Sequence, residues 1–264
     1  MSPILFHLYG PFAIHSFGVM IMIGLLLALF LLHRDQQLKE FITDEQLATI
    51  FQISFFGGII GGRIWFLITN ASMIEHWTEC FTVWSGGLSI SGALIGIITA
   101  LSCYFYYKQL PALPILDRLA LYGILAQSIA RWGCFFAGCC YGKATTLPWS
   151  IIYTHCDSLA PLHVHMHPTQ LYSSLFLACS FIILYLFDHY YTDKKAGQIL
   201  ALYIMLSSLD RFLIDFLRGD RELFVSTGFM KYFSTQQALA FCLFTGAFIM
   251  MNILFFYKRT DESI

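Results

Sequence analysis

The chain has 264 residues, of which 58% are hydrophobic and only 12% are charged, and its mean hydropathy is +0.68. A soluble domain carries about 25% charged residues, so this composition excludes an ordinary soluble protein and predicts a membrane protein. The net charge is −1 and the sequence has no large basic cluster, so nucleic acid is not expected as a partner.

Seven apolar blocks, each long enough to cross a bilayer as a helix, follow one another along the sequence. A spanning helix needs about 20 mostly apolar residues, and the blocks lie at about 13–33, 46–69, 86–107, 114–138, 168–188, 197–217 and 235–257. They lack the period-two alternation of barrel strands. We therefore predict an all-α, polytopic membrane protein in which residues 1–264 form a single membrane domain. The N-terminus lacks the basic region of a signal peptide, so the first block is expected to remain as a span.

The distribution of lysine and arginine between the loops predicts the orientation, because cytoplasmic loops are enriched in both residues. With the N-terminus outside, seven basic residues fall on the inner side and four on the outer side. The inner residues are Arg34, Lys39, Lys108, Lys194, Lys195, Lys258 and Arg259, and the outer residues are Lys143, Arg218, Arg221 and Lys231. We therefore expect an N-out/C-in topology, with residues 139–167 forming a small periplasmic loop element.

Several charged residues lie within or at the ends of these blocks, in the outer half of the bilayer: Arg63, Arg131, Arg211, Asp215 and Arg218. A charge at this depth costs about 2.5–3.5 kcal/mol, and it snorkels, pairs or binds an anion. Arg211 and Asp215 are four residues apart, a spacing that allows an ion pair, whereas Arg131 has no carboxylate nearby in the sequence. A lipid phosphate is the anion available at this depth, and a guanidinium binds phosphate through two hydrogen bonds.

Cysteines and histidines near Arg131 raise the alternative of a metal or redox site. They are Cys134, Cys139, Cys140, Cys156, His163, His165 and His167, and the histidines alternate as on one face of a strand. Zinc accepts such ligands, and a thiol near a cation is a candidate redox group. However, no C-x-x-C pair occurs, so we expect neither a metal nor a cofactor, and the cysteines are expected to pack between helices.

Seven stretches together resemble motifs of the prolipoprotein diacylglyceryl transferase family, which comprises seven-span enzymes of the bacterial inner membrane. In chain order they are HSFGVMIMIGLLLA, GGRIWFLITN, GGLSISGALIG, ARWGCFFAGCCYGKAT, HPTQLY, DRFLIDFLRGD and FSTQQALA. Their order and spacing are more specific than any single stretch. The resemblance implies a transferase that moves the diacylglyceryl group from phosphatidylglycerol to the lipobox cysteine thiol of a prolipoprotein. A thioether forms and glycerol 1-phosphate is released.

The resemblance also implies roles for individual residues. Arg131 would bind the phosphatidylglycerol headgroup at the periplasmic leaflet, with Arg211 as the second essential cation. We also expect Arg63, Arg218, Gly133 and Ser91 to contact this lipid. Ser91 stands where the family usually has histidine, and Phe17 and Ser207 stand where it usually has tyrosine. Because serine is a poor base, we expect His167 or Asp215 to accept the proton of the attacking thiol. Alternatively, the proline after His167 favours a role for this histidine in capping the next span.

Two other functions fit the same residues. A related membrane transferase with a different acceptor would keep the phosphate site, and so would a non-catalytic protein that binds or transports phospholipid. A transporter is expected to carry charges near mid-bilayer and internal repeats, and the sequence shows neither. The expected partners are therefore phosphatidylglycerol, the lipobox segment of a prolipoprotein and the lipid bilayer.

Overall fold

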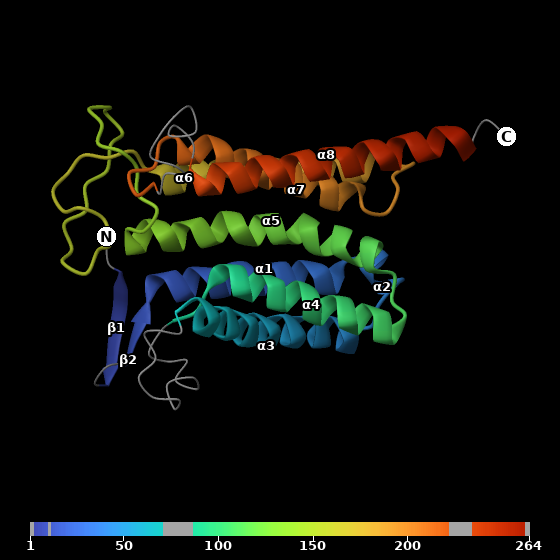
Figure 1. Cartoon of the computed structure of the whole chain (residues 1–264). Coiled ribbons are helices and arrows are strands. Elements are labelled where there is room, and N and C mark those ends of the chain that lie inside the picture. Colours follow the sequence, from blue (N-terminus) through green and yellow to red (C-terminus); the bar gives the residue numbers. More distant parts are fainter. Residues whose placement is uncertain (1–2, 10–11, 71–86, 222–233, 262–264) are drawn as a thin grey trace. The chain divides into compact units, whose positions relative to one another are not determined.

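A computed structural model describes residues 3–9, 12–70, 87–221 and 234–261 (Figure 1). The elements in chain order are β1 (Ile4–Tyr9), β2 (Phe12–His15), α1 (Ser16–Arg34), α2 (Gln36–Lys39), α3 (Asp44–Thr69), α4 (Ile90–Lys108), α5 (Ala112–Ala137), α6 (Thr169–Tyr190), α7 (Gln198–Asp215) and α8 (Thr235–Asp261). Every helix except α2 coincides, within a few residues, with one of the seven blocks predicted from hydropathy. Lys231 of the orientation count lies outside the described residues.

The described chain groups into two compact units. The first, which we call the bundle unit, comprises residues 1–34 and 116–264, and the second, the hairpin unit, comprises residues 35–115. The single membrane domain expected from the sequence stays a prediction.

In the hairpin unit, α3 packs closely against α4 through glycines of both helices. A Cβ atom built on Gly61 would lie 2.5 Å from the carbonyl oxygen of Gly92 and 2.7 Å from the Cα of Gly96. Only residues without a side chain allow the backbones to come this near, as in other small-residue helix contacts. The N-terminus of α3 is fixed by a capping box in which Thr43 and Gln46 exchange side-chain to backbone hydrogen bonds of 3.3 and 2.9 Å.

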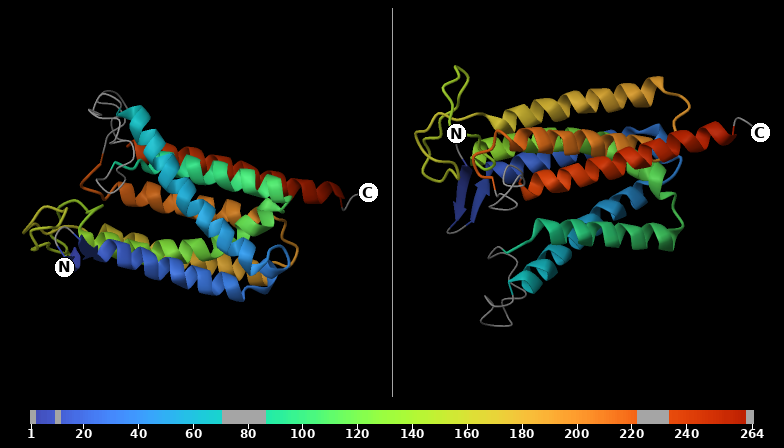
Figure 2. Two further views of the ribbon diagram at one scale, coloured as in Figure 1. Left: turned by 90° about the horizontal axis from the view of Figure 1, so that it is seen from below. Right: turned by 45° about the horizontal axis from the view of Figure 1, so that its top comes forward.

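The bundle unit contains α1, α5, α6, α7 and α8, which run roughly along a common direction (Figure 2). Between α5 and α6, the hydroxyl of Ser128 donates to the carbonyl oxygen of Ser174 at 2.8 Å. An apolar cluster from α5, α6 and α7 fills the interior, and its fully buried members are Leu121, Ile124, Leu177, Leu184 and Ile199. At one end, the Asp117 carboxylate accepts the backbone N–H groups of Gly197 and Leu200 at 2.7 Å each, which caps the start of α7.

Five of the described helices are long and apolar enough to cross a membrane, namely Ser16–Arg34, Asp44–Thr69, Ala112–Ala137, Thr169–Tyr190 and Thr235–Phe256. The sequence predicted seven spans. α4 and α7 fall outside the five, although each is 18 or more residues long. In α7 the reason is its charge, because Asp210, Arg211 and Asp215 all lie within its 18 residues.

The first predicted span begins later than hydropathy suggested, because residues 4–15 hold two antiparallel strands before α1 starts at Ser16. The sequence between the strands, Gly10-Pro11, is a turn signal. The connection from Gly138 to Pro168 is the long loop expected from the sequence. It lies at the end of the bundle unit where α5 ends and α6 begins (Figure 1). There the buried Tyr153 donates its hydroxyl to the Phe135 carbonyl oxygen at 3.0 Å.

Candidate active site

A pocket lies within the bundle unit where α5 ends, α6 begins and α7 ends. Its empty volume is about 240 Å³, part of which is open to the surroundings. Its lining residues are mostly polar or charged, namely Arg131, Cys140, Thr169, Gln170, Ser173, Asp210, Arg211, Ile214 and Arg218. Three of them carry a positive charge and one carries a negative charge. The pocket therefore has an excess of positive charge and suits an anion.

Arg131, in the last turns of α5, has a carboxylate neighbour that the sequence did not suggest. Its Nη2 lies 4.0 Å from Oδ2 of Asp210 on α7, and that same oxygen accepts a 2.6 Å hydrogen bond from the Ser173 hydroxyl. No carboxylate lies near Arg131 in the sequence, and this neighbour comes from another helix. Asp210 is 2% exposed, and its second oxygen, Oδ1, has no hydrogen-bond partner among the described residues.

Arg211 follows Asp210 on α7 and also lines the pocket. Within the described residues it makes no hydrogen bond and no ion pair. The pairing with Asp215 that the four-residue spacing allowed does not form, because the Asp215 carboxylate is taken up elsewhere. It accepts Nε of Arg221 at 3.2 Å and the Ser234 hydroxyl at 2.7 Å. The donors of Arg211 are therefore available to a ligand in the pocket.

Arg218 enters the pocket from the turn after α7. Its guanidinium forms two hydrogen bonds of 2.8 Å to the Asp220 carboxylate, and its Nη1 is buried without a partner among the described residues. Burial alone would lower the pKa of Arg218, but the hydrogen-bonded Asp220 carboxylate, together with the nearby Cys140 and Asp215, outweighs burial and raises the pKa. The backbone is fixed by the turn after α5, because Gly142 and Arg218 form a β-bridge. Arg218 therefore stays charged at the pocket.

The cysteine beside the pocket is electrostatically unusual. The neighbouring thiols of Cys134 and Cys139, together with the positive charges of Arg218 and Arg131, lower the pKa of Cys140 and outweigh its burial. The side chains of Thr169 and Gln170 hold the adjoining backbone: they donate to the carbonyl oxygens of Cys140 and Cys139 at 2.7 and 2.8 Å. Both donors belong to the stretch HPTQLY, so this motif shapes one wall of the pocket.

Two other predicted site residues of the bundle unit, His167 and Gly133, do not line this pocket. The Nδ1 atom of His167 is buried without a partner among the described residues, and its ring lies 6.2 Å from that of Tyr172. Gly133 serves packing, because a Cβ there would lie 3.0 Å from the Phe17 carbonyl oxygen. Arg63 and Ser91 belong to the hairpin unit, where Arg63 donates to the Gly87 carbonyl oxygen at 2.9 Å and Ser91 is exposed.

Sequence reasoning missed the polar residues that complete the pocket. Asp210 gave a usable signal, because a second charge directly before Arg211 in an apolar block implies a partner on a neighbouring helix. Ser173 gave none, since serine is common in membrane helices. The three histidines that alternate in the sequence do not form a ligand group in the described structure. His163 has a left-handed backbone with φ of +59°, so the segment is not a regular strand.

Together, the apolar helices and the arginine-lined pocket define a multi-pass membrane protein with a pocket of excess positive charge. The model of the family described as "Prolipoprotein diacylglyceryl transferase" matches residues 3–253, and the chain belongs to this family of transferases. A Clostridium tetani protein named phosphatidylglycerol–prolipoprotein diacylglyceryl transferase is 35% identical over 98% of this chain and 100% of its own. Proteins of the same name from Clostridioides difficile and Streptococcus uberis are 34% and 33% identical. They cover 83% and 82% of this chain, and 84% and 83% of their own length.

Proposed function

We propose that this protein transfers the diacylglyceryl group of phosphatidylglycerol to the lipobox cysteine thiol of a prolipoprotein, the first step of lipoprotein maturation. One observation carries the proposal: Arg131, Arg211 and Arg218 line a single pocket in a chain of this family. Guanidinium groups grip a phosphate through paired hydrogen bonds. The substrates named for the relatives are a phosphate-containing lipid and a prolipoprotein.

The chemistry explains why the pocket needs several cations. The thiol sulfur forms a bond to the carbon of the diacylglyceryl group that carries the phosphate. The bond between this carbon and the phosphate oxygen breaks. The leaving glycerol 1-phosphate gains one negative charge, and the thiol loses its proton. Donors fixed around the leaving oxygens stabilise this charge as it develops. Arg211 suits this role because its donors are not engaged within the described residues, whereas Arg131 is oriented by Asp210.

A proton acceptor is needed, and the geometry favours Asp210 over the two groups expected from the sequence. Asp210 lines the pocket and has one carboxylate oxygen without a hydrogen-bond partner in the described chain. Asp215 is already bound by Arg221 and Ser234, and His167 lies outside the lining. We infer that Asp210 accepts the thiol proton. Catalytic roles for Asp215 and His167, and lipid contacts of Arg63, Gly133 and Ser91, stay predictions.

The membrane arrangement belongs to the same proposal. All seven long helices are taken as spans, including the charged α7, with the N-terminus outside and the C-terminus inside the bacterial inner membrane. The basic-residue count supports this orientation. The pocket would then face the periplasmic leaflet, beside the long loop, where the lipobox segment of a prolipoprotein arrives. Reporter fusions to the two termini test the orientation, and a cytoplasmic N-terminus would reverse it.

The function is tested with purified protein, labelled phosphatidylglycerol and a lipobox peptide. We expect transfer to the peptide, and a loss of about 100–1,000-fold in kcat for Arg211→Ala, the range found when one charge-stabilising donor is removed. Arg211→Lys should recover little of this, because a point charge lacks the paired grip. Arg34→Ala is the matched control, since Arg34 lies over the Phe30 ring at the end of α1, outside the pocket lining.

The outcomes also separate the alternatives. Lipid binding without transfer to any peptide would favour the non-catalytic lipid-binding protein. Consumption of phosphatidylglycerol without product on the lipobox peptide would favour a transferase with another acceptor. Undiminished turnover by Arg211→Ala would contradict the proposed mechanism. Rescue of a bacterial strain depleted of its own diacylglyceryl transferase would support the reaction in cells.

A further inference from the structure

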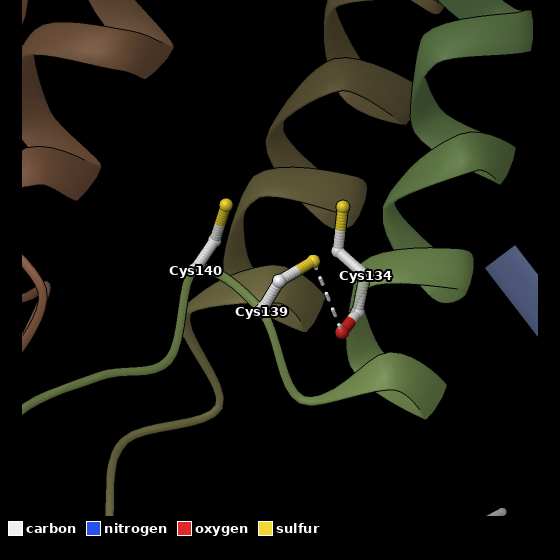
Figure 3. A group of neighbouring side chains, drawn as sticks. All are labelled: Cys134, Cys139 and Cys140. Carbon is white, nitrogen blue, oxygen red and sulfur yellow. Dashed lines mark hydrogen bonds between the residues drawn. The ribbon is translucent and has the colours of Figure 1, made fainter. Parts of the chain in front are cut away.

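Three thiols gather at the end of α5, beside the pocket. The sulfur atoms of Cys134, Cys139 and Cys140 all lie within 4.8 Å of one another, and all three residues are half-buried (Figure 3). Cys134 comes from the last turn of α5, and the other two come from the turn that follows. The proposed transfer reaction uses none of these thiols, because its nucleophile belongs to the prolipoprotein.

The backbone is shaped so that neighbouring cysteines face the same space. Adjacent side chains of an extended chain point to opposite sides. Here Gly138 and Cys140 have left-handed backbones, with φ of +76° and +56°. The Cys139 side chain points towards Cys134, and the Cys140 side chain extends in nearly the same direction as that of Cys134 (Figure 3). A non-glycine residue in this conformation costs about 1–2 kcal/mol. The hydrogen bonds from Thr169 and Gln170 to this turn maintain it, and such held strain is typical of ligand sites.

The separations suit three thiolates around one soft cation. Zinc–sulfur bonds are about 2.3 Å long, so three sulfurs around one ion lie roughly 4 Å apart. The thiols therefore need to close by less than about 1 Å. Binding replaces three thiol protons with one divalent cation, which leaves a complex of charge −1. Arg131 and Arg218 line the pocket together with Cys140 and offset that charge.

We propose that Cys134, Cys139 and Cys140 form a three-thiolate site for a thiophilic d10 cation such as Zn²⁺ or Cd²⁺. The sequence led us to expect cysteines that only pack between helices, and this proposal departs from that expectation. The spacing of the three cysteines resembles no usual zinc motif, and only the folded turn brings them together. Because Cys140 lines the phosphate pocket, an occupied site places a negatively charged complex against the two arginines. It therefore competes with the lipid phosphate, and this consequence rests on the proposed function.

Cadmium binding to the reduced, full-length protein in detergent tests the site directly. Thiolate–cadmium bonds give an ultraviolet charge-transfer band whose intensity reports the number of sulfur ligands. We expect one equivalent of Cd²⁺ bound with a three-sulfur band. Cys134→Ser and Cys139→Ser should each weaken binding at least about tenfold, since softness of the ligands sets the affinity. Their melting temperatures are measured alongside, to confirm that the variants are folded.

Two controls isolate the cluster from other thiols. Cys179→Ser removes an exposed cysteine from α6 and should keep full binding. Cys156→Ser removes the thiol of the second possible ligand group, His155, Cys156 and Asp157, which offers only one sulfur. This variant should keep the three-sulfur band. Absence of the band in the wild type, or equal affinity in folded Cys139→Ser, would overturn the proposal.

Turnover of labelled phosphatidylglycerol tests the consequence for the pocket. Stoichiometric Cd²⁺ should slow the wild type at least about tenfold and leave Cys139→Ser uninhibited. A three-sulfur absorption band without inhibition of turnover would contradict the competition between the metal complex and the lipid phosphate. If the metal-free protein transfers no lipid, the proposed function fails, but the absorption band still decides the thiolate site by itself.

Discussion

Replacing Asp210 with asparagine tests the proton acceptor with little change in shape. Asparagine keeps an acceptor oxygen for the Ser173 hydroxyl, which now donates to Asp210 at 2.6 Å. It removes the charge that lies 4.0 Å from Arg131, and the oxygen that is buried without a partner in the described chain. The substitution therefore separates the chemical role of Asp210 from its space-filling role.

The expected loss follows from the role assigned to this carboxylate. A positioned general base contributes roughly 10²–10⁴-fold to the rate, which is about 3–5 kcal/mol at 1.36 kcal/mol per tenfold. We expect kcat of Asp210→Asn to fall within this range. A role confined to orienting Arg131 would instead raise KM and leave kcat nearly unchanged.

Steady-state transfer from labelled phosphatidylglycerol to a lipobox peptide gives both constants. Asp215→Asn and His167→Gln are the matched comparisons, because each removes a base expected from the sequence. A lipobox peptide supplied with a more acidic thiol should partly rescue Asp210→Asn, since its proton leaves more easily. A change confined to KM, or a larger kcat loss in His167→Gln, would refute the assignment to Asp210.

Two further substitutions test the packing that supports the site. Gly61→Ala should destabilise the protein by about 1–3 kcal/mol through overpacking, because its Cβ would lie 2.5 Å from the Gly92 carbonyl oxygen. Gly123→Ala is the control, because nothing lies within 4 Å of its Cβ. Equal melting temperatures for the two variants would contradict the close contact between α3 and α4. Asp117→Ala should cost about 1–3 kcal/mol, because two N–H groups at the start of α7 lose their acceptor. Asp117→Asn should lower the free energy of unfolding by less, as measured in the same thermal unfolding experiment. An equal loss of stability in the two variants would argue against the cap.

Hydropathy alone located the seven long helices, because a membrane-spanning helix satisfies its backbone hydrogen bonds within one continuous apolar segment. Hydropathy also drew attention to Arg131 and Arg211, because a charge within an apolar segment is conspicuous in the sequence. It could not identify their partners. Arg211 and Asp215 have a favourable spacing on one helix, yet Asp215 binds Arg221 and Ser234, which follow α7.

The sequence by itself therefore determined that this is a helical membrane protein of the prolipoprotein diacylglyceryl transferase family. It also showed that Arg131 and Arg211 are unusual, because they lie within apolar segments. Only the tertiary structure decided which groups share the pocket. Asp210 meets Arg131 across two helices, and two left-handed residues bring three separated thiols together. Whether a segment forms an apolar membrane helix depends on residues that are near one another in the sequence. Ion pairs and ligand clusters depend on how distant segments pack, and on turn angles that hydropathy does not encode.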